Sequence, residues 1–379
     1  MLGPFPVGVP VRGENLIGRE KEVNQIVDLV QNHQSIVLIA PRRYGKTSIL
    51  LEVLDRLNKK GIFNCRVDIF QTSSKKELAQ EITNNVLKNK KTPFKDIIKT
   101  IRASLADALK HIEIKQVIED FEFIVSFADP KVDEDSLLKD ALDFPQEFAQ
   151  KYNQHLIIAF DEFGDLKKLN GDTLLKRMRA VFQLQTKVTY IFTGSQESLM
   201  EQLFANKHHA FFRFGRILYL GELPHSELSQ YIINTFENLG FIIKPEIANS
   251  IIKKTNAHPY YSQLLCQFIY FSLKGDKNVV EDKDVEENFL KAIYNERSYF
   301  EQLWSDLMER HHLLAVLRSI ADEDKQSPYR LKNLSNHNLY RSLSILENKG
   351  LIKKVTRGKY EIKDPLFKEY IRLREEGIF

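Results

Sequence analysis

The chain has 379 residues, 28% of them charged and 43% hydrophobic, a composition typical of a soluble globular protein of about two or three domains. A net charge of +4 does not by itself indicate nucleic-acid binding. Cys65 and Cys266 stand far apart in apolar surroundings, so we expect reduced core residues. No apolar run is long enough to cross a bilayer, and the proline-interrupted N-terminus is unlike a secretion signal. We therefore expect a cytoplasmic protein without a membrane partner.

The first 20 residues predict an arm followed by a turn. Residues 1–13 are rich in proline and glycine and indicate an extended arm. The stretch ENLIGRE (14–20) then leads into an amphipathic helix. A basic residue, Arg19, lies beside Ile17 just before that helix, which fits either a clamp on the adenine side of a nucleotide or an ordinary helix entry.

A buried strand, a short loop and a helix follow in the order of a P-loop. The run SIVLIA ends at Ala40, and Gly45-Lys46-Thr47 completes G-x-x-x-x-G-K-[ST] with alanine in place of the first glycine. That position need not have a positive φ angle, so alanine should be tolerated. The alternative is a chance G-K-T sequence before a helix.

This loop predicts the nucleotide contacts. Backbone N–H groups and the helix N-terminus would bind phosphate oxygens. Lys46 would reach the β- and γ-phosphates of ATP, or the β-phosphate of ADP, and the Thr47 hydroxyl would ligate Mg²⁺. The candidate nucleotide-binding residues are Ala40, Pro41, Arg42, Arg43, Tyr44, Gly45, Lys46, Thr47 and Ser48.

The second strand, Ile62–Phe70, is separated from the next, Leu156–Phe160, by far more chain than one crossover helix needs. We expect inserted structure over about 75–152. The patterns predict helices at about 75–89 and 96–111, a short hairpin within 112–127, and a helix at about 134–152 that bends at Pro145.

The strand at 156–160 ends in the pair Asp161-Glu162, which matches a Walker B motif. Asp161 would hold Mg²⁺ through water, and Glu162 would act as the general base that orients and deprotonates the attacking water. The alternative is a buried strand that simply ends in solvent. The preceding P-loop favours the catalytic interpretation.

A third buried strand, Val188–Phe192, is followed by Thr193 and Ser195. In a P-loop sheet this strand lies between the Walker A and Walker B strands, so either hydroxyl could sense the γ-phosphate; alternatively they cap the helix predicted at about 196–204. Arg213 and Arg216, before a fifth strand at 217–220, are candidates for an arginine finger or for ordinary surface cations.

From Pro224 the pattern is helical. Helices are predicted at Ser226–Leu239, Lys244–Thr255, Tyr261–Lys274 and Glu281–Glu301. A small helical domain after an α/β ATPase core is expected to be a lid that closes over nucleotide.

The C-terminal segment predicts a winged helix-turn-helix. Helices at Leu313–Ala321, Tyr329–Leu334 and Asn336–Glu347 precede a hairpin of Leu351–Val355 and Lys359–Ile362. Residues 311–379 hold 14 Lys and Arg against nine Asp and Glu. The third helix would expose Asn338, Arg341, Ser342 and Lys349, and the wing Lys353, Lys354, Arg357 and Lys359, as a DNA-reading module would. Winged helices also dock proteins, which is the alternative.

The stretches GENLIGREKEV, IAPRRYGKTSIL, IIAFDEF, YIFTGSQESLMEQLF, RFGRILYLGEL and HPYYSQLLC together resemble the prokaryotic, archaeal-type AAA+ ATPases of the STAND branch. The resemblance covers about residues 5–300 and extends, more distantly, to the origin-recognition initiators. It implies an α/β fold with a five-stranded parallel sheet, the P-loop strand central, and a helical lid. It also implies ATP or ADP bound between sheet and lid, with Pro259 in the lid's nucleotide-facing region, and a slow switch rather than fast turnover.

Three departures from the family pattern matter for mechanism. Gly164 replaces a frequent glutamine, Ala210 replaces a proline, and the lid lacks a clear sensor arginine, with His258-Pro259-Tyr260 in that region. The sequence therefore predicts an arm (1–13), an ATPase core (14–221), a lid (222–304) and a winged helix (305–379). The predicted function is a slow, Mg²⁺-dependent ATPase switch. We expect this switch to bind double-stranded DNA, or alternatively to act in STAND-type signalling through a protein partner or homo-oligomer.

Overall fold

The computed structural model describes residues 3–89, 133–169, 171–273, 278–308, 310–322, 328–331 and 334–379. Two compact units emerge from the contacts of the chain. The sheet unit comprises Lys21–Ala40 and Lys46–Leu220, and the helical unit comprises Met1–Glu20, Pro41–Gly45 and Gly221–Phe379. The helix predicted at 96–111 and the hairpin within 112–127 lie outside the described residues.

The sheet unit is built on five parallel strands, as the sequence predicts. They are β1 (Ile36–Ile39), β2 (Phe63–Asp68), β3 (Leu156–Asp161), β4 (Val188–Gly194) and β5 (Arg216–Tyr219). Their order is β2-β3-β4-β1-β5. The strand after the Walker B strand therefore lies between β1 and β3, as expected. The middle position belongs to β4, so the expectation of a central P-loop strand is wrong: β1 is interior but second from the edge.

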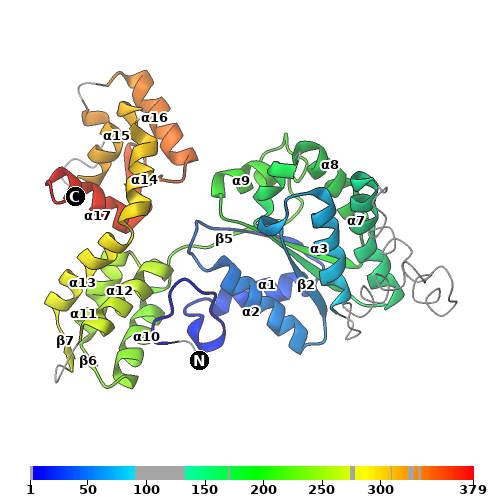
Figure 1. The fold of residues 1–379 in the computed structure, drawn as a ribbon, viewed down its shortest axis with the longest axis horizontal. Helices are drawn as coiled ribbons and strands as arrows, with labels where there is room; N and C mark the ends of the chain where they lie inside the picture. Colours follow the sequence, from blue (N-terminus) through cyan, green and yellow to red (C-terminus); the bar gives the residue numbers. More distant parts are fainter. Residues whose placement is uncertain are drawn as a thin grey trace, which may run out of the picture. The chain divides into compact units, whose positions relative to one another are not determined.

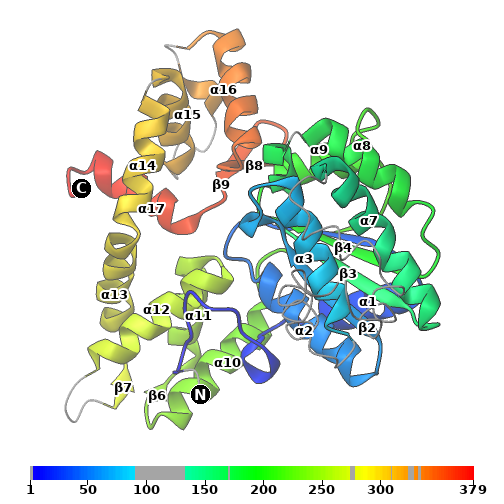
Figure 2. The ribbon, with the colours of Figure 1, turned by 45° about the vertical axis from the view of Figure 1, so that its right-hand side comes forward.

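Helices cover both faces of this sheet. They are α1 (Glu20–Gln31), α2 (Lys46–Lys59), α3 (Lys75–Leu87), α7 (Glu134–Lys151), α8 (Gly171–Phe182) and α9 (Glu197–Ala205), with 3₁₀ turns η2 (Ile69–Gln71) and η4 (Phe163–Leu169). Figures 1 and 2 show α1 and α2 on one face and α3, α7, α8 and α9 on the other. Alternate residues of a strand point to opposite faces, which explains why strands covered on both sides read as continuous apolar runs. The helix α7 continues through Pro145.

Side chains of β1 to β4 form one core with α3, α7, α8 and α9. Aromatic rings fill much of it: Phe160 stacks on Phe182 and on Phe192, with ring centroids 5.6 and 6.0 Å apart. Phe211 is 1% exposed and packs against Phe192 at 5.5 Å, which anchors the chain before β5. The core thus holds the carboxyl ends of β1, β3 and β4 in fixed register.

The helical unit contains α10 (His225–Asn238), α11 (Pro245–Thr255), α12 (Pro259–Ser272), α13 (Asp282–Asn295), α14 (Arg297–Met308), α15 (His311–Ala321), α16 (Asn336–Asn348) and α17 (Pro365–Glu375). Shorter elements are the 3₁₀ turns η1 (Gly13–Asn15) and η5 (Pro328–Arg330), a parallel pair β6 (Ile242–Ile243) and β7 (Val279–Val280), and an antiparallel hairpin β8 (Ile352–Thr356) and β9 (Lys359–Ile362). The sequence did not predict β6, β7 or α17.

Three predictions for the helical unit need correction. The short helix predicted at Tyr329–Leu334 is, among the described residues, the three-residue 3₁₀ turn η5. The single helix predicted at Glu281–Glu301 is broken at Glu296, whose φ and ψ of −89° and 0° end α13 before α14 begins. Ser342 is buried, at 4% exposure, and so does not belong to the exposed side of α16. It lies beside the core residues Leu339 and Leu343, where a small side chain fits within the buried stripe.

The N-terminal arm is anchored by one side chain. Phe5 is fully buried and packs on Phe236 and Tyr231, with ring centroids 4.8 and 6.2 Å apart. Its carbonyl accepts a hydrogen bond from Gln267 at 3.1 Å. The two cysteines are free and buried, as expected. None of the described helices combines the length and apolar composition needed to cross a membrane.

Candidate nucleotide site

The loop between β1 and α2 contains two residues with positive φ angles. Gly45 has a φ of 86° and Arg43 a φ of 67°, whereas Ala40 does not have a positive φ. The structure therefore explains why glycine is needed at 45 and why alanine is compatible with the first motif position. A helix of 14 residues, α2, begins directly after the loop, so its N-terminal N–H groups face the same place.

Lys46 is folded back over this loop. Lys46 is 5% exposed, and its ammonium group donates a hydrogen bond of 2.8 Å to the carbonyl of Ala40. Thr47 is half-buried and Ser48 is buried, while Pro41 is half-buried and Arg42 is exposed. The lysine thus spans the loop from its last residue to its first.

Asp161 ends β3 and is held by two neighbouring strands. It is 2% exposed; its Oδ1 accepts a hydrogen bond from the Thr193 hydroxyl of β4. Its Oδ2 accepts two from Arg66 of β2, at 2.9 and 2.7 Å. A buried carboxylate is costly unless it is paired, and these contacts supply the pairing.

Glu162 follows in a left-handed conformation, with a φ of 54°. Its Oε2 accepts hydrogen bonds from the backbone N–H and the hydroxyl of Ser195, at 2.9 and 2.8 Å. Neither Thr193 nor Ser195 caps α9, because the cap position is Gln196 and makes no side-chain cap bond. The capping alternative is therefore wrong, and both hydroxyls instead orient the acidic pair.

Arg66 was missed by the sequence interpretation. It lies inside β2, opposite Ala159, and also contacts Asp68 at 2.9 Å. A charged residue in the interior of a strand was the available signal, because a buried charge requires a partner. The carboxylate of Asp161 is therefore neutralised by an arginine of β2, which β3 and β4 separate from the P-loop strand β1.

The cation-binding prediction fits the side chains present. Thr47 and Asp161 offer a hydroxyl and a carboxylate, the hard oxygen donors that Mg²⁺ prefers. Bound Mg²⁺ would supply charge neutralisation to the phosphates of a nucleotide. Both Asp161 oxygens already have hydrogen-bond partners, so metal binding and the Arg66 contact draw on the same carboxylate.

Residues at the tip of the loop make contacts within the helical unit. The Arg43 guanidinium lies 2.5 Å from Oε2 of Glu296, with its Cζ 4.2 Å from the ring centroid of Tyr260. The Tyr260 hydroxyl donates to Oε1 of Glu296 at 2.9 Å. The ring of Tyr44 meets that of His258 at 4.5 Å. Two successive loop residues therefore pack against the beginning of α12.

The environment at the start of α12 explains the ionisation of these groups. Burial, together with the charge of Arg43, lowers the pKa of His258 to about 3. The neutral ring can accept the N–H groups of Tyr260 and Tyr261 and so caps the helix, where Pro259 is the first residue. Burial raises the pKa of Tyr260 to about 12, so this hydroxyl stays a donor.

The turn before α1 is packed rather than open. Arg19 is 2% exposed and donates a hydrogen bond of 2.5 Å to the carbonyl of Gly221. Gly18 has a φ of 62°, and a Cβ there would stand 2.7 Å from Cδ of Pro224. Ile17 is half-buried against the core of the helical unit. These contacts account for the turn as a packed helix entry; the adenine clamp stays a prediction.

The two candidate arginines before and in β5 are exposed. Arg213 has a φ of 53° and its guanidinium lies 5.2 Å from the ring centroid of Phe212. Arg216 is the first residue of β5 rather than of the preceding loop. Within the described part of the chain, neither arginine forms a hydrogen bond or ion pair with Asp161 or Glu162, and the finger role stays a prediction.

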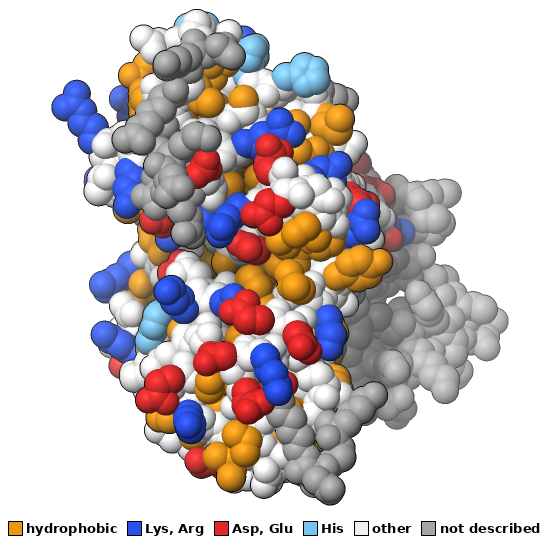
Figure 3. All heavy atoms as spheres, turned by 90° about the vertical axis from the view of Figure 1, so that its left-hand side faces the viewer, with side chains coloured by type: hydrophobic (Ala, Val, Ile, Leu, Met, Phe, Trp, Pro, Cys, Tyr) orange, Lys and Arg blue, Asp and Glu red, His pale blue; other side chains and the backbone are white. Residues whose placement is uncertain are grey.

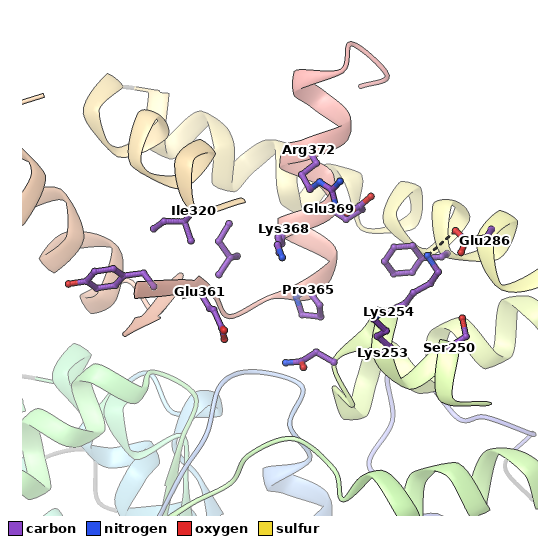
Figure 4. A pocket seen from close by; sticks show the side chains of 14 residues that line it. Ser250, Lys253, Lys254, Glu286, Ile320, Glu361, Pro365, Lys368, Glu369 and Arg372 are labelled. Atoms are coloured by element: carbon purple, nitrogen blue, oxygen red, sulfur yellow. Dashed lines mark hydrogen bonds and ion pairs between the residues drawn. The ribbon is translucent and has the colours of Figure 1, made fainter. Parts of the chain in front are cut away.

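A separate pocket of about 540 Å³ lies within the helical unit, between α11, α13, α15, β9 and α17 (Figure 4). Two of the cationic side chains that line it pair with acids: Lys254 with Glu286 at 2.8 Å and Arg372 with Glu369 at 3.2 Å. It contains none of the residues predicted to bind nucleotide. We therefore place the candidate site at the loop and not at this pocket.

Comparisons with known proteins agree with the geometry. Residues 16–223 match the model of an ATPase domain predominantly from Archaea. The fold is similar to that of a Walker-type ATPase from Pyrococcus abyssi, with a TM-score of 0.70, 16% identity, and coverage of 97% of this chain and 99% of that one. No curated protein matches the sequence.

Two further structures share the fold at lower similarity. The ORC2 protein of Aeropyrum pernix has a TM-score of 0.54 at 12% identity, covering 96% of this chain and 98% of that one. Cdc6p from Pyrobaculum aerophilum has a TM-score of 0.50 at 13% identity, covering 99% and 98%. At these identities the likeness concerns the fold alone.

Proposed function

Because the chain belongs to the family of ATPase domains found predominantly in Archaea, we propose that this ATPase works as a slow, Mg²⁺-dependent nucleotide switch. The family assignment makes it a P-loop ATPase that binds ATP. The proposal adds the roles of individual residues: phosphate binding by the loop and Lys46, metal binding by Thr47 and Asp161, and water activation by Glu162.

One observation carries the proposed roles. The acidic pair at the end of β3 is oriented by hydroxyls of β4, with Thr193 on Asp161 and Ser195 on Glu162. A general base must be held where it can meet the attacking water, and such orientation is the work of neighbouring groups. The similar ORC2 structure contains ADPNP and ADP, which supports ATP and ADP as the ligands here.

Nucleotide binding and hydrolysis are separated by two variants. Lys46→Ala should abolish binding of a fluorescent ADP analogue in the presence of Mg²⁺, because it removes the cation from the phosphate site. Glu162→Gln should keep binding and lose hydrolysis by at least about 10²-fold, the usual size of a general-base contribution. Tight ATP binding by Lys46→Ala would overturn the site assignment. Lys59→Ala, an exposed lysine of the same helix, is the matched control.

We further propose that the segment from α15 to β9 is a winged helix that couples this switch to double-stranded DNA. Helices α15 and α16 with the antiparallel hairpin β8–β9 support this proposal, with the 3₁₀ turn η5 where a short helix was expected. Arg341, Lys349, Lys354, Arg357 and Lys359 are exposed. Lys353 differs, because it lies 3.5 Å from Glu222 and 3.8 Å from Glu361. Cations on α16 and the hairpin suit contacts to DNA phosphates.

A protein partner is the alternative, as in STAND-type signalling or homo-oligomerisation. Tyr340 of α16 and Tyr329 of η5 are 59% and 42% exposed and lie ring against ring at 6.0 Å. Exposed tyrosine pairs are typical of protein interfaces. Figure 3 also shows basic and acidic side chains intermixed on the face it presents, rather than a field of one sign.

A DNA titration distinguishes the DNA partner from the protein partner. Labelled duplex is titrated at two salt concentrations with ADP, with a slowly hydrolysed ATP analogue, and without nucleotide. A DNA output requires affinity that falls steeply with salt, because each neutralised phosphate releases counterions. It should weaken in Lys354→Glu/Arg357→Glu and persist in Tyr340→Ala. Absence of DNA binding in every state, with concentration-dependent association lost in Tyr340→Ala, would favour the protein partner.

A further inference from the structure

The phosphate-binding loop contains an arginine in a backbone conformation that arginine does not favour. Arg43 has a φ of 67°, in the left-handed region. For residues other than glycine this region is unfavourable because Cβ approaches the following carbonyl. Such a conformation persists where surrounding contacts hold it. The loop thus depends on something other than its own backbone preference.

The contacts of the Arg43 side chain supply that support. Its guanidinium meets Oε2 of Glu296 at 2.5 Å and lies over the ring of Tyr260 at 4.2 Å. Glu296 is 5% exposed, so the ion pair forms against a desolvated carboxylate, where electrostatic attraction is stronger than at the surface. The Tyr260 hydroxyl and the Asn295 amide donate to Oε1, at 2.9 and 3.2 Å, which fixes the carboxylate.

Neither partner is part of the loop. Tyr260 lies in the first turn of α12, and Glu296 is the residue at which α13 ends before α14 begins. Tyr44, the next residue of the loop, is buried with its ring against His258, at the same end of α12. The helices at 259–308 therefore hold the loop at two consecutive side chains.

We propose that Arg43 is a positioning residue whose clamp on Glu296 and Tyr260 holds the phosphate-binding loop in its nucleotide-competent turn. Nucleotide affinity then depends on a carboxylate about 250 residues away in the sequence, which itself needs no contact with the nucleotide. Any movement of the α13–α14 junction that withdraws Glu296 lowers that affinity. This inference rests on the proposed nucleotide site.

The competing possibility is that Arg43 binds phosphate directly and Glu296 holds it away. The two mechanisms predict opposite results for one variant. Removing the carboxylate charge in Glu296→Gln weakens ADP binding if the clamp shapes the loop. The same substitution strengthens ADP binding if it frees Arg43 to reach a phosphate.

The test is the dissociation constant for fluorescent ADP with Mg²⁺, measured in the full chain. Loss of the clamp should cost about the left-handed penalty of 1–2 kcal/mol, which is about 5- to 30-fold in affinity. We expect this loss in both Glu296→Gln and Arg43→Ala, and no additional loss in the double variant, because both remove one shared interaction. Glu301→Gln, in the exposed Arg297–Glu301 pair of α14, should leave affinity unchanged.

A rescue variant distinguishes loop geometry from general damage. Glycine adopts the left-handed conformation without support, so Arg43→Gly should bind ADP more tightly than Arg43→Ala. Combined with Glu296→Gln, it should recover affinity relative to Glu296→Gln alone. A merely structural defect at Glu296 would not be repaired by glycine at 43.

The outcomes are separable from those of the proposed function. Wild-type protein that does not bind ADP overturns the nucleotide site itself. Wild-type binding with unchanged or tighter binding in Glu296→Gln overturns the clamp and leaves the site intact. Equal affinities of Arg43→Gly and Arg43→Ala would also overturn it.

Discussion

Arg66 of β2 donates two hydrogen bonds to Oδ2 of Asp161 of β3, at 2.9 and 2.7 Å, and so pairs the Walker B carboxylate across the sheet. The carboxylate is 2% exposed, whereas the arginine is 31% exposed. The same carboxylate is the predicted metal ligand. The arginine is therefore placed to balance its charge when Mg²⁺ is not bound.

Removing the Arg66 guanidinium should destabilise the sheet unit. Arg66→Ala leaves a buried carboxylate without its ion-pair partner, which typically costs about 3 kcal/mol. We expect a loss of about 2–3 kcal/mol in the free energy of unfolding measured in urea, since the arginine is partly solvated. Mg²⁺ with ADP should recover part of the loss, because a bound ligand stabilises the folded state. An unchanged urea midpoint, or no recovery with ligand, would contradict this account. Lys59→Ala, which breaks an exposed pair with Asp55, is the control.

Ser195 should act on the rate of hydrolysis through Glu162. Ser195→Ala removes one of the two hydrogen bonds to Oε2 and leaves the backbone N–H in place. We expect kcat for ATP hydrolysis to fall about tenfold while the KM for ATP changes little, since the carboxylate loses orientation but the phosphate loop is untouched. Single-turnover hydrolysis measures this directly. A rise in KM with unchanged kcat would instead indicate a nucleotide-contacting serine. Ser198→Ala, in α9, is the matched control.

The stability of the sheet unit should depend on pH through His155. Its ring is half-buried, bonded to Thr189 at 2.8 Å and packed on His33 at 3.9 Å. Burial, and then the neighbouring His33, lowers the pKa of His155 to about 4, below the value of about 6.5 in an unfolded chain. Between these values the unfolded chain binds a proton that the folded one does not, so the free energy of unfolding falls as the pH falls from 6.5 to 4.

The pH dependence of the unfolding free energy needs a His155 variant, because other groups contribute to it. Burial raises the pKa of Asp364 to about 6, which acts in the opposite direction: its folded form binds the proton more readily, so falling pH favours folding there. The difference between wild type and His155→Gln in urea unfolding at pH 7 and pH 4.5 removes that contribution. We expect the variant to lose about 1 kcal/mol of the pH dependence, less than the full shift because the ring is partly solvated. Equal pH dependences would contradict the prediction. His312→Gln, at an exposed position, serves as the control.

Phe5 should matter far more than its place in a proline-rich arm indicates. Phe5→Ala removes a fully buried ring from between Phe236 and Tyr231. Loss of a buried phenylalanine costs about 3–5 kcal/mol, so the helical unit should unfold at lower urea concentration. The arm should also become sensitive to limited proteolysis. Phe70→Ala, at a 69% exposed position, should change the unfolding free energy by less than about 0.5 kcal/mol. Similar midpoints for both variants would refute the anchoring role.

Much of the sheet unit was determined by the sequence alone. The runs at 36–39, 156–161 and 188–194 are buried throughout and largely apolar because both faces of each strand are covered. Each run ends at or next to residues of the candidate site. Gly45-Lys46-Thr47 and Asp161-Glu162 are short-range patterns, in which the chemistry and the chain connection lie within a few residues. Periodicity likewise located most helices of the helical unit.

What only the tertiary structure decided are the partners of those residues. Arg66 meets Asp161 across 95 positions, and Arg43 meets Glu296 across 253, so no local pattern could pair them. The same holds for Ser195 beside Glu162 and for Phe5 against α10. The sequence states which side chains carry charge or bulk. The local pattern does not encode how distant segments pack. That packing decides which side chains are buried together, and therefore the pKa, the orientation and the role of each.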